Sequence, residues 1–180
     1  MERSWREWSP LEHVLTRVPL RVSGHLPGLG VDQEVTCLAA HPSYLALGTS
    51  AGMIYWYNRR EDSLKRLEAF SAAVTAIAMV ETVDMMLAAG NHEGDVAIFQ
   101  IPKLGTSATS PEDGGGVSPS AGPGQAQDIQ QFSIRGVHSR TVSALAWSLN
   151  GQKLISGDVG GAVHCSTVVS GGISCQFYYF

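Results

Sequence analysis

The stretch "VSALAWSLNGQKLISGDVGGAVH", residues 142–164, decides the fold, because the chain contains it three times in altered form. The other copies are "VTCLAAHPSYLALGTSAGMIYWYN" from Val35 and "VTAIAMVETVDMMLAAGNHEGDVAIFQ" from Val74. Each copy has an alternating apolar run, a polar turn and a second run that ends in small residues. A glycine then precedes a third run, at Gly52, Gly94 and Gly161. This pattern predicts consecutive antiparallel strands.

The spacing of the copies predicts the blades of a β-propeller. Val35 and Val74 lie 39 residues apart, whereas Val74 and Val142 lie 68 apart, and residues 102–131 account for the difference. That segment is rich in Gly, Pro and Ser and has no aromatic residue, so we predict a disordered loop inserted in the second repeat. The remaining period of about 40 residues is the length of a four-stranded blade, and apolar spacing of two argues against helical repeats.

The expected fold class is therefore all-β, an incomplete propeller of about three blades with a short N-terminal helix. The N-terminal segment is 1–20 and the propeller 21–180, with blades at 35–70, 71–135 and 136–180. We place the fourth strands of the first two blades at 63–70 and 129–135.

The helix is predicted in "SPLEHVLTRVP", with Ser9 as N-cap, Pro10 at the first helical position and Pro19 as its end. Its apolar face would comprise Leu11, Val14, Leu15 and Val18. Closed propellers have about 4–8 blades, so three leave a bare face at each end. The helix is expected to cap one end, whereas the tail "FYYF" is too short and apolar to cap the other. One hypothesis is therefore that the sequence is a shortened splice product.

Composition excludes several classes of partner. The net charge is −4, and acidic residues interrupt the densest basic cluster, which excludes nucleic acid. Three cysteines without CxxC spacing predict reduced thiols and a cytoplasmic location. Neither a signal-peptide core nor a long uncharged apolar run is present, which predicts no direct membrane insertion.

Several residue groups resemble chemical sites, and each has a structural alternative. His92 and Glu93 would suit a metal or acid–base site, or a hairpin turn. Ser156, Asp158 and His164 would suit a catalytic triad, or structural hydrogen bonds between side chains that need not converge. The aromatic run at 55–57 would form a ligand platform or pack in the core. The glycines of "GHLPGLG" at 24–30 lack the context of a dinucleotide loop. We expect no catalytic residue, metal or cofactor.

The third copy resembles a WD repeat, on the residues "ALAWSLNG" and "LISGDVGG" and on His138 four residues before Val142. The family often joins a His, a Ser or Thr, an Asp and a Trp by hydrogen bonds within a blade. The resemblance places His138 and Ser156 in that network as blade-stabilising residues. It places Val159 at the acidic position and Ser166 at the Trp position, so the network is expected to be broken. The acidic places in the other copies fall on Ser50 and His92.

Within that family, "EWSPLEHVLTRVP", "YLALGTSAGMIYWY" and "MLAAGNHEGDVAIFQ" are similar to the N-terminal propellers of tectonin β-propeller-repeat proteins. The similarity to Hermansky–Pudlak-type trafficking scaffolds is looser. The similarity to the tectonin-type propellers spans about Trp8 to Val163, and the tail "STVVSGGISCQFYYF" matches them poorly. The resemblance implies a non-catalytic scaffold for protein partners in autophagy or membrane trafficking. A propeller-based hydrolase and a truncated product without independent function are the alternatives.

Two further motifs concern partners. Trp8 and Leu11 in "EWSPL" fit the aromatic-x-x-aliphatic pattern that docks on ubiquitin-like autophagy modifiers, although a helix there would oppose strand addition. Ser110 and Ser118 each precede a proline in the predicted loop, where they are candidate phosphorylation sites or ordinary loop residues.

Overall fold

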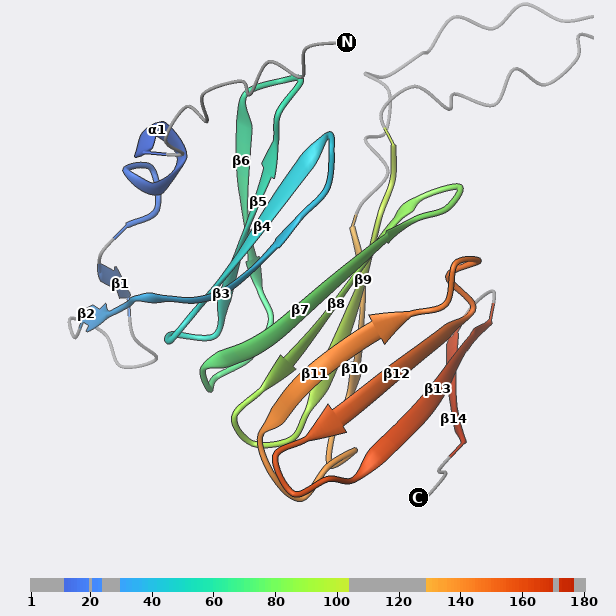
Figure 1. Ribbon diagram of the computed structural model, residues 1–180. Helices are drawn as coiled ribbons and strands as arrows, with labels where there is room; N and C mark the ends of the chain where they lie inside the picture. Colours follow the sequence, from blue (N-terminus) through green and yellow to red (C-terminus); the bar gives the residue numbers. More distant parts are fainter. Residues whose placement is uncertain (1–11, 20, 24–29, 104–128, 170–171, 177–180) are drawn as a thin grey trace, which may run out of the picture.

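The chain folds into three stacked, four-stranded antiparallel sheets (Figure 1). In each sheet every strand pairs with its neighbour in sequence, so each sheet is a simple meander. A two-stranded ribbon, β1 (Arg21–Ser23) and β2 (Gly30–Asp32), precedes them. The computed structural model describes residues 12–19, 21–23, 30–103, 129–169 and 172–176.

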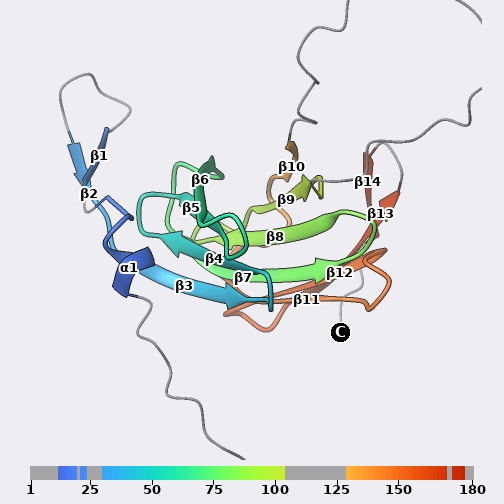
Figure 2. The same ribbon diagram turned by 90° about the horizontal axis from the view of Figure 1, so that it is seen from above.

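The sheets are the expected blades, and the all-β, incomplete-propeller fold class is confirmed. Blade 1 comprises β3 (Val35–Ala40), β4 (Tyr44–Thr49), β5 (Met53–Asn58) and β6 (Ser63–Glu68). Blade 2 comprises β7 (Val74–Glu81), β8 (Met85–Asn91), β9 (Val96–Ile101) and β10 (Gln130–Ile134). Blade 3 comprises β11 (Val142–Trp147), β12 (Lys153–Asp158), β13 (Val163–Val169) and β14 (Gly172–Gln176). Seen from above, the first strands β3, β7 and β11 lie along one side and the last strands along the other (Figure 2).

Each first strand carries the same irregularity at its second residue. The register shifts just after the opening valine, at Thr36, Thr75 and Ser143. The hydroxyl of Thr36 donates to the carbonyl of Val74 at 2.6 Å, and the hydroxyl of Thr75 donates to the carbonyl of Val142 at 2.5 Å. A bulge leaves its extra residue outside the ladder. The repeat therefore uses the hydroxyl residue after each valine to join one blade to the next.

Thr75→Val is expected to lower the free energy of unfolding by about 1 kcal/mol, because it removes this hydrogen bond at almost constant volume. Ser143→Ala is the matched control. The Ser143 hydroxyl is exposed and donates at 3.3 Å to Gly157 of its own blade. Urea unfolding of both variants measures the difference, and equal losses would contradict a role for Thr75 between blades.

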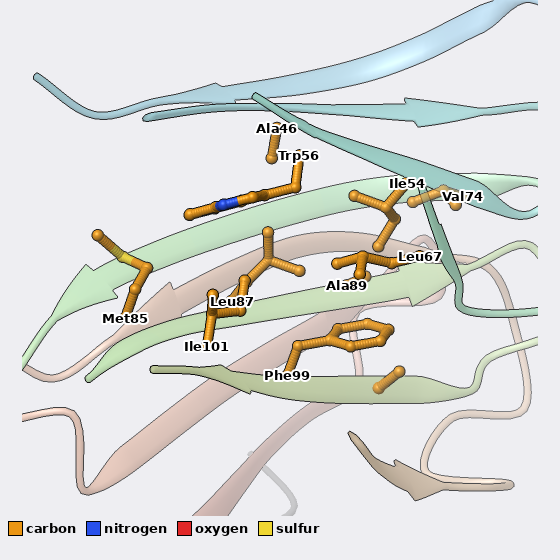
Figure 3. Packing of buried hydrophobic residues seen from close by; sticks show 11 residues of the cluster. Ala46, Ile54, Trp56, Leu67, Val74, Met85, Leu87, Ala89, Phe99 and Ile101 are labelled. Carbon is orange, nitrogen blue, oxygen red and sulfur yellow. The ribbon is translucent and has the colours of Figure 1, made fainter. Parts of the chain in front are cut away.

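Small residues let the blades approach closely. A Cβ at Gly48 would lie 2.8 Å from a methyl carbon of Val74, and one at Gly90 would lie 2.4 Å from a methyl carbon of Val142. Around the first contact, an apolar cluster fills the space between blades 1 and 2, and Trp56, Leu87 and Phe99 all point into it (Figure 3). A second cluster joins blades 2 and 3. The apolar alternation of the sequence thus supplies both faces of blade 2.

The N-terminal helix caps blade 1 but ends earlier than predicted, before Val18. Helix α1 spans only Glu12–Leu15, and the backbone then tightens into hydrogen bonds three residues apart. Val14 and Val18 are buried against blade 1 on the face away from blade 2, together with Leu45, Leu47, Tyr55 and Tyr57. Leu15, predicted on the apolar face, is instead 45% exposed, because a single helical turn presents only a narrow stripe to the sheet. Ser9, Pro10 and Leu11 lie outside the described residues.

The predicted end of the loop needs correction, whereas β10 falls within the predicted fourth strand at 129–135. β10 begins at Gln130, inside the predicted loop 102–131, and pairs with β9 through Gln130 and Gln131. The backbone supplies a strand's ladder bonds, so polar side chains can occupy an exposed last strand. Residues 104–128 of that loop lie outside the described part. In the tail, β14 pairs with β13 from Cys165 to Val169 and so lies within the predicted bounds of the third blade, 136–180. The "FYYF" end falls beyond the described residues.

Candidate protein-interaction site

Three predicted polar residues converge in blade 3, around His138. His138 Nε2 lies 2.8 Å from Ser156 Oγ in a hydrogen bond, and His138 Nδ1 lies 3.4 Å from Asp158 Oδ2. Ser156, Asp158 and His164 share a face because β12 alternates and Ser156 lies opposite His164 in the ladder. The His138 and His164 rings meet edge to face at 4.4 Å. The expectation that these side chains need not converge was wrong, since His138 from the preceding segment gathers them.

This Ser–His–Asp arrangement has the order of a catalytic triad but lies in the interior. The three residues and the neighbouring His164 are all buried, and Ser156 is only 2% exposed. A nucleophile must reach its substrate, and a triad also needs donors for the oxyanion. The position of the group between strands favours structural hydrogen bonding. That His138 and Ser156 stabilise the blade remains a prediction.

Burial sets the charge of His138, whereas hydrogen bonds set the charge of Asp158. Burial lowers the pKa of His138, the neighbouring His164 lowers it further, and Asp158 opposes both effects only in part. Burial acts to raise the pKa of Asp158. The backbone N–H groups of Ala162 and Gly160, with His138, outweigh burial and lower it overall. The folded blade therefore favours neutral His138 beside an ionised Asp158.

Stability is expected to fall as the pH drops below 6.5, the ordinary pKa of histidine. A lowered histidine pKa means that the unfolded chain binds the proton more readily, so its contribution is complete above 6.5 and declines below it. The Asp158 contribution is lost only below 3.8 and that of Glu81, whose pKa is also lowered, only below 4.5, which leaves the interval from 6.5 to 4.5 to His138 among the groups with a shifted pKa. Melting temperatures across that interval should decline less steeply for His138→Gln than for the unchanged chain. An identical slope would contradict this assignment.

The predicted acidic position of the network lies one residue too far along the chain in every copy. The turn acceptors are Thr49, Asn91 and Asp158, not Ser50, His92 and Val159. Each takes a hydrogen bond from the backbone N–H four residues on, at Met53, Asp95 and Ala162. Val159 is 62% exposed. The missed signal was an oxygen-bearing residue three before the turn glycine, as expected for side chains that cap turns.

The other suggested sites have structural roles. His92 and Glu93 lie in the β8–β9 turn, where the Thr141 hydroxyl donates to the His92 carbonyl at 3.0 Å. Trp56 is buried between blades 1 and 2, while Tyr55 and Tyr57 are buried beneath α1. The aromatic run therefore packs in the core.

The remaining sequence motifs are not covered by the structure. Trp8, Leu11, Ser110 and Ser118 lie outside the described residues, as do the glycines of "GHLPGLG" other than Gly30. Among the residues that are described, no group of three or more His, Cys, Asp or Glu side chains could hold a metal ion. In that same part of the chain no helix has the length and apolar character to cross a membrane.

A polar groove of about 590 Å³ lies between blades 2 and 3, at the end where β9 finishes. Amide and hydroxyl side chains line it beside Met86 and Val168. The polar lining comes from Thr82, Gln100, Asn150, Gln152 and Thr167. Gln100 donates to Asp84 at 2.6 Å and Asn150 donates to Gln152 at 2.9 Å, so these amides are held in place. Sequence reasoning missed this groove, because its residues come from turns and strand ends of two blades.

A smaller hollow of about 170 Å³ lies between the ends of blades 1 and 2. It is lined by polar and charged side chains, including Asn91, Glu93, Asp95, Ser133 and Arg135. The groove is larger and carries no charged side chain in its lining, which makes it the better candidate for binding a neutral peptide backbone.

The three stacked four-stranded meanders define a WD-repeat-like β-propeller segment. No protein-family model matches the chain. It is 38% identical over 162 residues to WD repeat-containing protein CG11141 of Drosophila melanogaster, covering 89% of this chain and 21% of that protein. It is 29% identical over 167 residues to human Tectonin beta-propeller repeat-containing protein 2, covering 92% of this chain and 10% of that protein. The chain thus spans about a fifth or less of the length of these relatives.

Solved structures show the same fold at low sequence identity. A chain of the Mitotic Checkpoint Complex matches with a TM-score of 0.54 at 17% identity, covering 81% of this chain and 36% of that chain. The β-propeller domain of Cps50 (Swd1) from Myceliophteria_thermophila matches with a TM-score of 0.53 at 14% identity, covering 79% and 42%. The WD-repeat-like resemblance is confirmed, because the homologues carry WD or β-propeller repeats and the structural neighbours include β-propellers.

Proposed function

We propose that this chain is a non-catalytic, cytoplasmic scaffold that binds proteins of membrane traffic or autophagy. Its likeness to WD-repeat propellers supports a protein-interaction role. The traffic or autophagy assignment rests on the resemblance of the repeats to scaffolds of those processes. The Ser–His–Asp group does not support the hydrolase alternative, because its candidate nucleophile Ser156 is buried and hydrogen-bonded.

The groove between blades 2 and 3 is the observation that carries this proposal. Side-chain amides offer both donors and acceptors, and hydroxyl groups offer the same in one atom. An extended peptide presents alternating N–H and C=O groups along its backbone. The groove pairs such partners with the apolar side chains of Met86 and Val168. This chemistry fits an uncharged, extended segment of a partner protein.

Proximity labelling in cells with the full chain tests the proposal. Gln152→Arg places a bulky charge at an exposed position in the groove, and Ser133→Arg adds the same charge at the smaller hollow. We expect traffic or autophagy proteins among the labelled neighbours, depleted several-fold by Gln152→Arg and retained by Ser133→Arg. Identical neighbours for all three chains would contradict the groove as the binding site. Absence of such proteins around the unchanged chain would contradict the cellular assignment.

The docking motif is tested in the same experiment. Trp8→Ala should deplete ubiquitin-like autophagy modifiers while leaving the groove-dependent neighbours in place. Unchanged labelling of those modifiers would contradict the motif without affecting the groove.

A further inference from the structure

Blades 1 and 2 meet through the same kind of interface as blades 2 and 3. Among the described residues, one half of this interface is uncovered on blade 3 and the complementary half is uncovered on blade 1. At both existing interfaces, the first valine of one blade packs over a glycine in the second strand of the blade before it. The pairs are Val74 over Gly48 and Val142 over Gly90. The remaining valine, Val35, and the remaining glycine, Gly157, lie at opposite ends of the array.

Blade 3 presents the same surface that blade 2 uses to bind blade 3. On blade 2 that surface includes Ala76, Ala88, Val96 and Ile98, all buried by blade 3. Strand register places Ala144, Ile155, Val163 and Cys165 at the equivalent positions of blade 3. We call these four residues with Gly157 the open face. Ile155 is 47% exposed where Ala88 is fully buried, so no described residue covers the open face as blade 3 covers blade 2.

Blade 1 presents the complementary surface. Val35 is 42% exposed, whereas its equivalents Val74 and Val142 are fully buried. Leu38 is 60% exposed, although its equivalents Ile77 and Leu145 pack against the preceding blade. The helix α1 covers the neighbouring strands β4 and β5 and leaves these two side chains uncovered.

The hydrogen bonds that join one blade to the next have no counterpart among the described residues at the open face of blade 3. Thr36 and Thr75 each donate to the valine carbonyl of the following blade, and Thr75 also donates to Gly90 of its own blade. Ser143 makes the equivalent own-blade bond, to Gly157. The turn glycines Gly52 and Gly94 accept backbone N–H groups from the segment that enters the next blade. A Cβ at the equivalent Gly161 would have no atom within 4 Å.

We propose that the open face of blade 3 binds the β3 surface of blade 1 in a second copy of this chain. The two existing interfaces supply the register, with Val35 of one copy over Gly157 of the other. Such a head-to-tail contact closes into a ring when the rotation permits, and two copies would supply six blades, within the usual range of about 4–8. Full stacking requires α1 to move from β4 and β5, so α1 and the second copy compete for one face. The Arg17–Asp62 ion pair is exposed and therefore weak, so the buried side chains of Val14 and Val18 make the main contact that the second copy must displace.

Sedimentation analysis of the full chain tests this proposal. We expect a concentration-dependent species with the mass of two chains. Ile155→Asp and Leu38→Asp should each give a monomer, whereas Val83→Asp, at an 82% exposed turn position, should leave the dimer intact. All three positions are exposed, and circular dichroism checks that each variant folds.

Mixing the two monomeric variants tests the geometry of the contact. Ile155→Asp retains its blade 1 surface and Leu38→Asp retains its open face, so the mixture should restore a species of two chains. A monomeric unchanged chain would overturn the proposal. Dimers of Leu38→Asp alone would also overturn it, because they would show the open face binding another open face.

Discussion

Gly94→Ala is expected to lower the free energy of unfolding by about 3 kcal/mol, from backbone strain and overlap combined. Gly94 has φ of +93°, in the left-handed region, and a Cβ there would lie 2.2 Å from the carbonyl oxygen of His138. The same glycine accepts the backbone N–H of His138 at 3.1 Å. The substitution therefore disturbs the point where the chain enters blade 3.

Gly161→Ala is the matched control, because it isolates the cost of strain. Its φ is +90°, and a Cβ would meet no atom within 4 Å. Only the left-handed backbone then penalises alanine, with a loss of about 1–2 kcal/mol. Urea unfolding of the two variants measures the difference. Equal losses would contradict the close crossing of the Gly94 turn and the entry to blade 3.

Phe99→Ala is expected to cost about 3–5 kcal/mol, the usual range for a fully buried aromatic residue. Phe99 is 2% exposed and lies in the cluster that joins blades 1 and 2 (Figure 3). Removing the ring leaves a cavity that neighbouring strands cannot fill without moving. The loss should separate blade 1 from blade 2 rather than unfold one blade alone.

Val83→Ala provides the control for Phe99. Val83 is 82% exposed in the β7–β8 turn, and surface substitutions usually change stability by less than about 0.5 kcal/mol. Thermal unfolding followed by circular dichroism measures both variants. A loss below about 1 kcal/mol for Phe99→Ala would contradict a packed interface between these blades.

The sequence predicted the blades well because their periodicity reflects burial. The valines that open each copy begin β3, β7 and β11, and the alternating residues after them divide between the two faces of each sheet. The predicted helix extended too far toward Val18, because helix propensity does not show how much of a helix the sheet can bury. Leu15 fitted the helical spacing yet points away from blade 1.

The polar network was harder to predict because it depends on exact orientation. Spacing placed the acidic role on Val159, whereas Asp158 performs it from the last position of β12. A shift of one residue reverses the face of a strand, so repeat spacing alone cannot select between neighbours. The groove could not be predicted at all, since Gln100 and Gln152 meet only after blades 2 and 3 stack.

The central claim is that the three valines begin separate sheets stacked face to face. Nuclear Overhauser effects between glycine α-protons and valine methyl groups test it most directly, because the relevant atoms touch only across blades. The account predicts strong effects from Gly48 to Val74 and from Gly90 to Val142. Absence of both effects, with cross-strand effects among Val35, Val74 and Val142 instead, would place the valines in one continuous sheet and contradict the stacked blades.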